Sequence, residues 1–370
     1  MSRPAVIVSQ SGAVTPGLRA VVSASGDDVV ETVTVDRRED NRYYLSPPTL
    51  DRVETLCDGL EATEPRVVVD GTVHPGQMVD LGERLPSAAL QDRRGAILKR
   101  LGETNPAAAT RFELRRTRIA RRAAARDQRD GAADTPSGES GRLAEHDERR
   151  GRLRERLDDR QREARRRVDD AYTDVDGHVV LLARGDGTAA TEAWTALTGD
   201  DADAEPAAGR PAGATMATAA VGPHTVAVTD APGVVAADGF PAWFADAVPG
   251  VVAALEQADL VLCSGVDPDG LVATLAERFD GTHEAVAATP EAVRARVTDT
   301  FGAADYVVRL PYGDDAQALL SELHESAAVA DVAYGDEVTV RLTVSRSAAE
   351  SLVRRIEAVG GTARPANGTD

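Results

Sequence analysis

The longest regular alternation of hydrophobic and polar positions lies between residues 107 and 172. Apolar side chains recur there at the steps of a helix face, in two groups: Phe112, Ile119 and Ala123, and then Leu153, Leu157, Ala164, Val168 and Ala171. The spacing predicts two long helices, Thr110–Arg126 and Arg142–Ala171, joined by the polar loop Gly131–Arg142. Both stripes are thin, so they suffice for an antiparallel seam but not for a core.

Short apolar runs alternate with helical spacing in the first hundred residues. The expected strands are Pro4–Ser9, Asp28–Val35, Val67–Val69 and Ala88–Leu90, and the expected helices are Thr49–Leu60 and His74–Leu85. Strands that alternate with helices predict a small open parallel sheet. The lone His74 is interpreted as a cap or turn residue.

A second α/β pattern follows residue 173. The expected elements are a strand His178–Ala183, a loop Arg184–Ala189, a helix Ala190–Leu197, a low-complexity connection Ala202–Gly213, a strand His224–Thr229, an amphipathic helix Phe240–Gln257 and a strand Asp259–Cys263. Trp194 and Trp243 are expected to pack in the core.

The last pattern predicts an α+β module. Its expected elements are the strand Tyr306–Leu310, the helix Asp314–Glu325, the strands Val329–Tyr334 and Glu337–Val344, the helix Ala348–Val359 and a polar tail from Gly360. We therefore divide the chain into an α/β domain (1–106), a helical hairpin (107–172), a second α/β domain (173–303), the module (304–362) and a tail (363–370).

The composition is sufficient for hydrophobic cores, and the net charge is strongly negative. It has 370 residues, 42% of them hydrophobic, and a net charge of −19. No apolar window approaches a membrane span, and Met1–Gln10 lacks a signal-peptide pattern, so we expect a soluble cytoplasmic protein. Lys99 is the only lysine, and such acidic, lysine-poor surfaces are typical of salt-loving cytoplasms. Cys57 and Cys263 are expected to be buried, reduced thiols.

The hairpin carries a net positive charge, whereas the chain as a whole is negative. Between Arg111 and Arg167 there are 19 arginines and 12 acidic residues, a net charge of +7, which leaves −26 for the rest. One interpretation is a solvated hairpin with intrahelical pairs such as Arg152–Glu155 and Glu163–Arg167. The other is an arm that binds RNA phosphates. The candidate RNA-binding residues are Arg115, Arg118, Arg122, Arg126, Arg129, Arg142 and Arg149.

A glycine-bearing turn lies between the predicted strand His178–Ala183 and the helix that follows. Such a turn presents backbone N–H groups and a helix dipole to a phosphate, and here it contains Gly185, Asp186 and Gly187. The segment also fits the dinucleotide pattern G-x-G-x-x-A. That fold expects an acidic residue about 20 positions later, whereas the next strand ends at Asp230, 43 residues after Gly187.

The order of motifs resembles that of the HflX family of GTP-binding proteins. The segments that carry the resemblance are Val67–Leu101, with the D-R-x-G-x-I run Asp92–Ile97, the hairpin loop Ser137–Leu143, A-L-T-G at Ala196–Gly199, the turn Asp230–Gly233, Phe240–Leu262 and Arg309–Leu342. The resemblance implies a P-loop-type GTP-binding domain and association with rRNA of the large ribosomal subunit. It also implies that Asp230 and Thr191 serve a Mg²⁺ ion and that Gly233 senses the γ-phosphate.

This sequence departs from that family at the residues that grip the nucleotide. Ala189, Ala190 and Thr191 stand where G-K-S is expected, and the chain has no N-K-x-D. Without the lysine, the phosphates lack a positively charged partner. Without N-K-x-D, the site lacks selectivity for the base. Arg184 precedes the loop and substitutes only in part.

We therefore expect a monomeric ribosome-associated protein with weak or lost GTP hydrolysis, which binds Mg²⁺ and GTP only if the site is functional. Three alternatives stay open: an active GTPase with an unconventional loop, a structural protein–protein interaction module, and a dinucleotide-binding enzyme. No G-x-S-x-G and no paired histidines occur, so serine hydrolase and zinc chemistry are unsupported.

Overall fold

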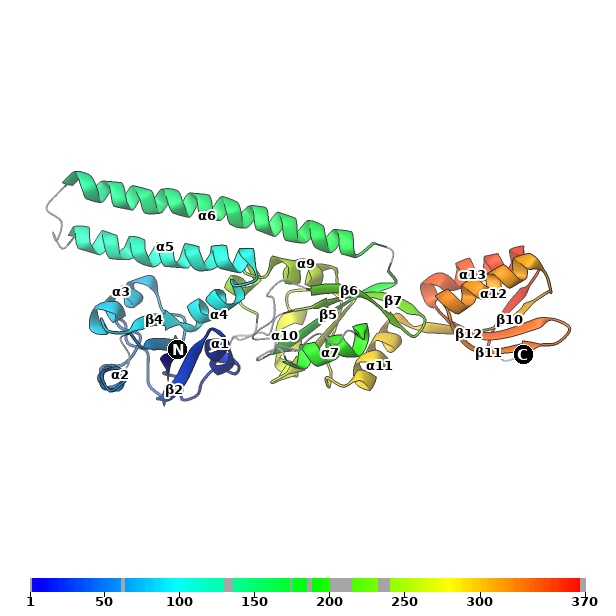
Figure 1. Cartoon of the computed structure of the whole chain (residues 1–370), viewed down its shortest axis with the longest axis horizontal. Coiled ribbons are helices and arrows are strands. Elements are labelled where there is room, and N and C mark those ends of the chain that lie inside the picture. Colours follow the sequence, from blue (N-terminus) through cyan, green and yellow to red (C-terminus); the bar gives the residue numbers. More distant parts are fainter. Residues whose placement is uncertain are drawn as a thin grey trace.

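Two α/β domains, a helical hairpin and an α+β module are arranged along the long axis of the molecule (Figure 1). The structure is a computed structural model, and it describes residues 2–60, 64–129, 136–173, 175–184, 188–199, 215–231 and 240–366. The predicted mixed α/β class is confirmed. Among these residues, no helix is long and apolar enough to span a membrane.

The N-terminal domain is a parallel sheet with helices on its faces. Its elements are β1 (Arg3–Ser9), α1 (Leu18–Ala24), β2 (Asp27–Thr34), α2 (Pro47–Asp58), β3 (Arg66–Asp70), α3 (Pro75–Arg84), β4 (Ala89–Asp92) and α4 (Arg93–Leu101). The strand order is β2-β1-β3-β4, and all pairings are parallel. Val67, Val68 and Val69 are fully buried, as expected for a strand that is covered on both faces. The parallel sheet predicted from the sequence is therefore confirmed.

Two side chains cap helices in this domain. The Nδ1 atom of His74 accepts a hydrogen bond from the backbone N–H of Gly76 (3.2 Å), and the side chain of Gln77 accepts from the His74 N–H. This is a capping box, so the prediction that His74 is a cap residue is confirmed. Asp92 caps α4 by accepting from the N–H of Gly95.

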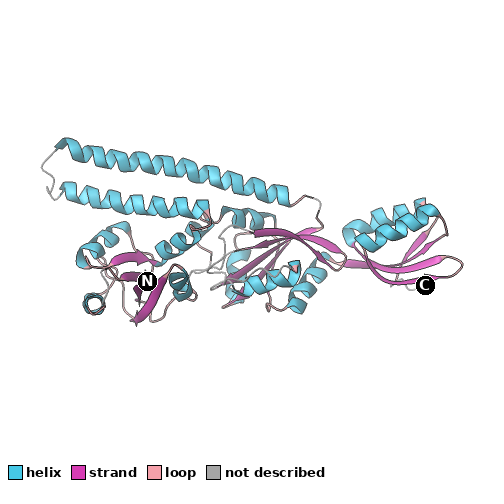
Figure 2. Ribbon diagram, in the orientation of Figure 1, coloured by secondary structure: helices cyan, strands magenta, loops and turns pink. Residues whose placement is uncertain are grey.

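The hairpin consists of α5 (Pro106–Arg129) and α6 (Pro136–Ala171), which lie side by side (Figure 2). Leu114, Leu153, Leu157 and Val168 are buried along it. Residues 136–142, which were expected in the loop, belong to α6. Proline is tolerated in the first turn because the N–H it lacks has no partner there. The part of the predicted loop between residues 130 and 135 lies outside the described residues.

The central domain carries a five-stranded sheet among the described residues. Its elements are β5 (Gly177–Arg184), α7 (Thr188–Thr198), β6 (Thr215–Val221), β7 (His224–Asp230), α8 (Ala242–Ala245), α9 (Pro249–Gln257), β8 (Leu260–Gly265), α10 (Pro268–Ala276), β9 (Thr282–Ala285) and α11 (Pro290–Phe301). The order is β6-β7-β5-β8-β9, with β6 antiparallel to β7 and the other pairings parallel. The predicted connection Ala202–Gly213 lies outside the described residues.

The expected single helix Phe240–Gln257 is wrong, because the structure divides it into α8 and α9. The interruption falls at Val248, which has non-helical φ and ψ angles of −126° and 58°. The cause is Pro249, since the residue before a proline is driven away from the helical region. Phe240 and Phe244 pack edge to face with ring centroids 5.3 Å apart.

The C-terminal module has the element order β10 (Ala303–Leu310), α12 (Asp314–Ser326), β11 (Ala328–Tyr334), β12 (Val338–Ser345), α13 (Arg346–Ala358) and β13 (Thr362–Pro365). Its strand order, β11-β12-β10-β13, is that of a split β-α-β fold. The predicted polar tail from Gly360 is corrected here, because residues 362–365 form an antiparallel strand on β10.

One apolar cluster joins three parts of the molecule. It includes Ile7 of β1, Ala108 of α5, Val168 of α6, and Val180 and Phe244 of the central domain. The amide of Asn105 also donates to the carbonyl of Ala247 (3.1 Å). The hairpin is thus packed against both α/β domains rather than standing free of them.

The predicted buried positions are largely confirmed. Trp194 is 4% exposed in the central core, and Trp243 packs at the edge of the shared cluster. Cys57 and Cys263 are buried and free. Burial raises the pKa of Cys263 to about 12, so this thiol is not a nucleophile at neutral pH.

Candidate functional site

The carboxyl ends of β5, β7 and β8 form the edge where the sequence predicts a nucleotide site. Asp230 ends β7 in register with Leu181 of β5, and the N–H of Ala231 donates to the Leu181 carbonyl (3.0 Å). The carboxylate of Asp230 is therefore at this edge, but the residue is only 7% exposed. Ligands of α/β proteins bind at such an edge, where the strand order reverses.

The other predicted nucleotide residues stay predictions. Gly185, Asp186, Gly187 and Gly233 lie outside the described residues. Thr191 is in α7, and the position of its side chain is not described. Of the predicted metal ligands, Thr191 and Asp230, only the aspartate carboxylate is placed. No group of three or more potential metal-binding side chains occurs in the described parts of the chain.

A guanidinium stands at this edge, but it has a partner. Arg184 ends β5, and its Nη1 donates to the Oδ2 of Asp267 (2.6 Å). Asp267 in turn caps α10 by accepting from the N–H of Gly270 (3.2 Å). At the start of α7, Ala189 and Ala190 pack against the core. The described residues at this edge thus include one buried carboxylate, that of Asp230, and one ion pair, Arg184–Asp267.

The edge also lacks the geometry of the dinucleotide alternative. A dinucleotide-binding half has parallel strands throughout, whereas β6 runs antiparallel to β7. The connection from β5 to the parallel strand β7 thus contains α7 and also the additional antiparallel strand β6.

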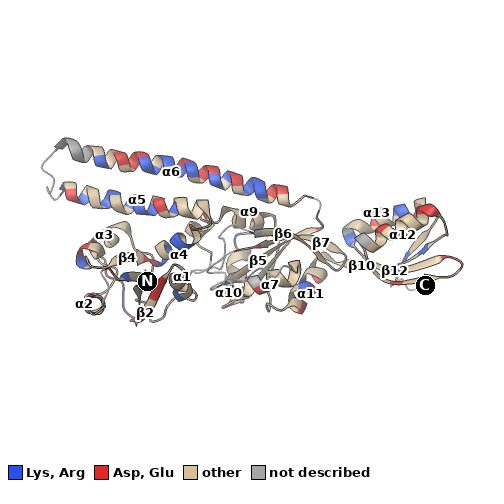
Figure 3. Ribbon diagram, in the orientation of Figure 1, with Lys and Arg blue, Asp and Glu red and all other residues tan. Residues whose placement is uncertain are grey.

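Four of the eight arginines of α5 form ion pairs with carboxylates on other elements. Figure 3 shows how basic and acidic residues are distributed along the ribbon. The ion pairs of α5 are Arg111–Asp246, Arg115–Asp92, Arg121–Asp147, Arg126–Asp80 and Arg126–Glu83. These contacts reach β4, α3, α6 and the residue that follows α8. They attach the helix to its surroundings.

Arg115, one of the predicted RNA-binding residues, forms a buried ion pair within the fold, and its role in RNA binding stays a prediction. It is 9% exposed, and its Nε and Nη2 donate to the two carboxylate oxygens of Asp92 at 3.2 and 2.5 Å. Nη2 also donates to the carbonyl of Val73 (3.1 Å). A residue buried in this way offers little surface to a phosphate in solution. Arg126, with two carboxylate partners on α3, is likewise engaged within the fold.

The arginines of α6 are paired mostly within their own helix. The pairs are Arg150–Asp147, Arg152–Glu148, Arg160–Glu163, Arg162–Asp159 and Arg167–Glu163. The predicted Glu163–Arg167 pair is present, while Arg152 pairs with Glu148 and not with Glu155. Arg149 reaches Glu113 on α5 (3.7 Å), and Arg165 reaches Glu256 on α9.

A further set of hairpin arginines has no carboxylate partner among the described residues. This set is Arg116, Arg118, Arg122, Arg129, Arg142, Arg154, Arg156 and Arg166. All are exposed except Arg118, which is half-buried. The predicted candidates Arg118, Arg122, Arg129 and Arg142 belong to this set. The interpretation as a hairpin with intrahelical ion pairs therefore fits one part of the arginines, and the interpretation as a phosphate-binding arm stays open for the other.

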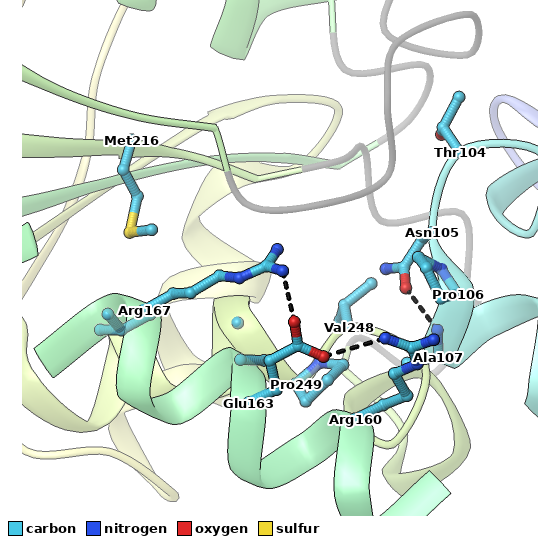
Figure 4. A pocket seen from close by; sticks show the side chains of 13 residues that line it. Thr104, Asn105, Pro106, Ala107, Arg160, Glu163, Arg167, Met216, Val248 and Pro249 are labelled. Atoms are coloured by element: carbon cyan, nitrogen blue, oxygen red, sulfur yellow. Dashed lines mark hydrogen bonds and ion pairs between the residues drawn. The ribbon is translucent and has the colours of Figure 1, made fainter. Parts of the chain in front are cut away.

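A small pocket lies where the hairpin meets the central domain. Its volume is about 160 Å³, and Asn105, Arg160, Glu163, Arg167 and Val248 are among the residues that line it. Glu163 lies between the two arginines and bonds to both (Figure 4). The pKa of Glu163 is lowered below its usual 4.5, mainly by the hydrogen bond from Arg160 and next by the charge of Arg167. The lining of this pocket thus carries two guanidinium groups and one carboxylate, which leaves a net positive charge.

Comparisons with known proteins find matches among solved structures only. No family model and no curated protein matches the chain. Among solved structures, a GTP-binding protein from the hyperthermophilic archaeon Sulfolobus solfataricus in complex with GDP has 11% identity and a TM-score of 0.40, over 81% of this chain and 98% of that one. A second structure, of SsGBP with GDP, has 11% identity and a TM-score of 0.41, over 81% and 97% of the two chains.

Proposed function

We propose that this chain is an RNA-binding protein of HflX-like organisation and that its partner is the large ribosomal subunit. The carrying observation is the set of exposed hairpin arginines that have no carboxylate partner among the described residues. Exposed guanidinium groups bind phosphate oxygens without reading sequence, which suits structured RNA. The hairpin also keeps its net charge of +7 in a chain of −19.

The proposal is tested by ribosome binding with two matched triple variants. Arg122, Arg129 and Arg142, replaced together by Gln, lose charges that have no described carboxylate partner. Arg152, Arg160 and Arg162, replaced together by Gln, lose the same charge from side chains that are already paired. Affinity for purified large subunits is measured over a range of KCl concentrations.

We expect the first variant to bind at least about tenfold more weakly and to lose about two units of its salt slope, since each phosphate contact contributes about 0.7–0.9. The second variant should stay within about twofold of the unmutated chain. Equal losses in both variants would mean that net charge alone drives binding. Full binding by the first variant would instead support a protein–protein contact and overturn the RNA proposal.

We propose in addition that GTP hydrolysis by the central domain is weak or lost. Support comes from the burial of Asp230, from the Arg184–Asp267 pair, and from the alanines at the expected glycine and lysine positions. Calorimetric titration of GTP, GDP and ATP with Mg²⁺ should give no saturable binding at millimolar nucleotide. Saturable GTP binding that disappears in Asp230→Ala would support the alternative of an active GTPase.

A further inference from the structure

A small pocket lies at the end of the C-terminal module that points away from the central domain (Figure 1). The loop between β10 and α12 and the two ends of the turn between β11 and β12 form it. Leu310, Pro311, Tyr312, Leu320, Tyr334 and Val338 are among the residues that line it. Its volume of about 190 Å³ is below the range of about 300–1,000 Å³ that is usual for small-molecule sites. The pocket therefore suits one long side chain.

Strand register brings the walls of this pocket together. Leu310, the last residue of β10, lies opposite Val338 of β12, and Val338 lies opposite Tyr334 at the end of β11. The hydroxyl of Tyr312 donates a hydrogen bond to the carbonyl of Gly335 (2.9 Å), which connects the loop after β10 to the turn between β11 and β12. The two tyrosines thus belong to one site, although they come from different elements.

Both tyrosines are exposed above an apolar floor. Tyr312 is 61% exposed and Tyr334 is 71% exposed, whereas Leu310 and Val338 are buried. In the described structure no arginine lies over the ring of either tyrosine, in contrast to Trp243, which has Arg94 over it. Exposed aromatic side chains around an apolar pocket indicate an interaction site, because their rings stay in contact with water until a partner covers them.

The rim of the pocket is acidic. Asp314 and Asp315 begin α12, and Asp336 and Glu337 belong to the turn between β11 and β12. All four are exposed, and none forms an ion pair with another described residue. The arginine nearest in sequence, Arg309, is exposed on the opposite face of β10, since successive residues of a strand alternate between its faces. This end of the module is therefore negatively charged.

We propose that this pocket docks a basic peptide segment of a protein partner, with an arginine side chain stacked on Tyr334. A guanidinium group stacks on aromatic faces and is attracted by the negative face of the ring. The four carboxylates of the rim complement the other cations of such a segment, and they repel the phosphates of RNA. The site thus differs in place and in charge from the hairpin arginines, and it adds a protein contact to the proposed RNA contact.

The proposal is tested with the full chain and a fluorescently labelled peptide of alternating arginine and glycine. Fluorescence anisotropy should show saturable binding that weakens as KCl is raised, because salt screens exposed charges. A peptide of alternating glutamate and glycine should not bind. The assay contains no ribosomes, so its outcome is independent of the proposed RNA contact. Absence of saturable binding by the arginine peptide would overturn the proposal.

Two variants of Tyr334 separate ring stacking from general apolar contact. Tyr334→Leu keeps an apolar side chain but removes the ring, so the arginine peptide should bind about three- to fivefold more weakly. Tyr334→Phe keeps the ring and should stay within about twofold of the unmutated chain. Because the side chain is 71% exposed, neither variant should disturb folding. Full affinity in Tyr334→Leu would overturn the proposal.

A matched pair of double variants separates the pocket from the general acidity of the chain. Asp336→Asn with Glu337→Gln removes two rim charges and should weaken peptide binding about three- to tenfold at low salt. Asp28→Asn with Glu31→Gln removes the same charge beside Val30, an exposed apolar residue of β2, and should stay within about twofold. Equal losses in both would mean that the peptide binds acidic surface in general, which would overturn the site. Binding of polyuridylate that is lost in Tyr334→Leu would assign the pocket to RNA and overturn it as well.

Discussion

The two helices of the hairpin use the same side chain in different ways. In α5, Arg111, Arg115 and Arg126 reach carboxylates on the two α/β domains. In α6, five of the eleven arginines pair with an acid three or four residues away, as Arg152 does with Glu148 and Arg162 with Asp159. The first kind of pair connects elements distant in sequence, while the second stays on the surface of one helix.

The difference shows that the number of arginines in a segment does not measure the positive charge it can offer. A buried pair such as Arg115–Asp92 has lost its hydration and is costly to disrupt. An exposed pair in one helix is screened by water and contributes little. Side chains that belong to neither group meet an external anion without first giving up a carboxylate partner. Four predictions test this distinction.

The largest effect is expected for Arg115→Gln. The variant leaves the carboxylate of Asp92, which is 1% exposed, without its charged partner. Removing one member of a buried pair costs about 3–5 kcal/mol, measured as the free energy of unfolding in urea. The neighbouring exposed variant Arg116→Gln should change it by less than about 0.5 kcal/mol. Similar values for both would contradict the structural role of Arg115.

A smaller loss is expected for Arg126→Gln. This side chain is 26% exposed and binds Asp80 and Glu83 of α3. Partial exposure weakens both pairs, so we expect a loss of about 1 kcal/mol. Hydrogen exchange should locate the effect in α3 and the end of α5. Arg129→Gln, whose Nε donates only to the carbonyl of Ala125 in the described structure, is the control and should leave α3 unchanged.

A still smaller change is expected for Arg152→Gln. Its pair with Glu148 lies within α6, and both side chains are largely exposed (62% and 67%). Pairs of this kind contribute about 0.3–0.5 kcal/mol, and salt reduces that further. Urea unfolding in low and high KCl should show a change within this range. A loss of several kcal/mol would mean that α6 is held by its surface pairs.

The smallest effect is expected on the pKa values of two carboxyls. One, Asp147, pairs between the two helices, and the other, Glu163, pairs within α6. The hydrogen bond from Arg121 lowers the pKa of Asp147 below its usual 3.8, so this contact stabilises the chain above that pH and is lost as acid protonates Asp147. In Arg121→Gln, the pKa of Asp147 should rise towards its usual value. The pKa of Glu163, set by Arg160 and Arg167, should stay unchanged. NMR titration of the side-chain carboxyls measures both pKa values. A changed pKa of Glu163 would contradict the view that the two ion pairs are independent.

Much of the fold was predictable because it rests on local patterns. The buried run Val67–Val69 and the cap at His74 follow from neighbouring residues, and both were confirmed. Errors arose where a short segment takes its structure from a distant partner. Thr362–Pro365 becomes a strand only because β10 lies beside it. The break in Phe240–Gln257, in contrast, had a local signal in Pro249.

The candidate site was less predictable, because ion pairs join residues far apart in the chain. Arg184 and Asp267 are 83 positions apart, and no spacing rule connects them. The burial of Arg115 did leave a trace, since it falls between Phe112 and Ile119 at steps of three and four on the apolar stripe. The positions of Gly185 and Gly233 remain predictions.

The hairpin divides its attachments between the two α/β domains, because α5 packs on α3 and α4 while α6 packs on α9. A single backbone cut between Arg129 and Pro136 would therefore sever no contact of either helix with its own domain. The two fragments would stay associated through the seam around Leu153 and Leu157 and through the shared apolar cluster. Because α5 also forms ion pairs with both α/β domains, through Arg111 and Arg115, the hairpin braces the two domains against each other.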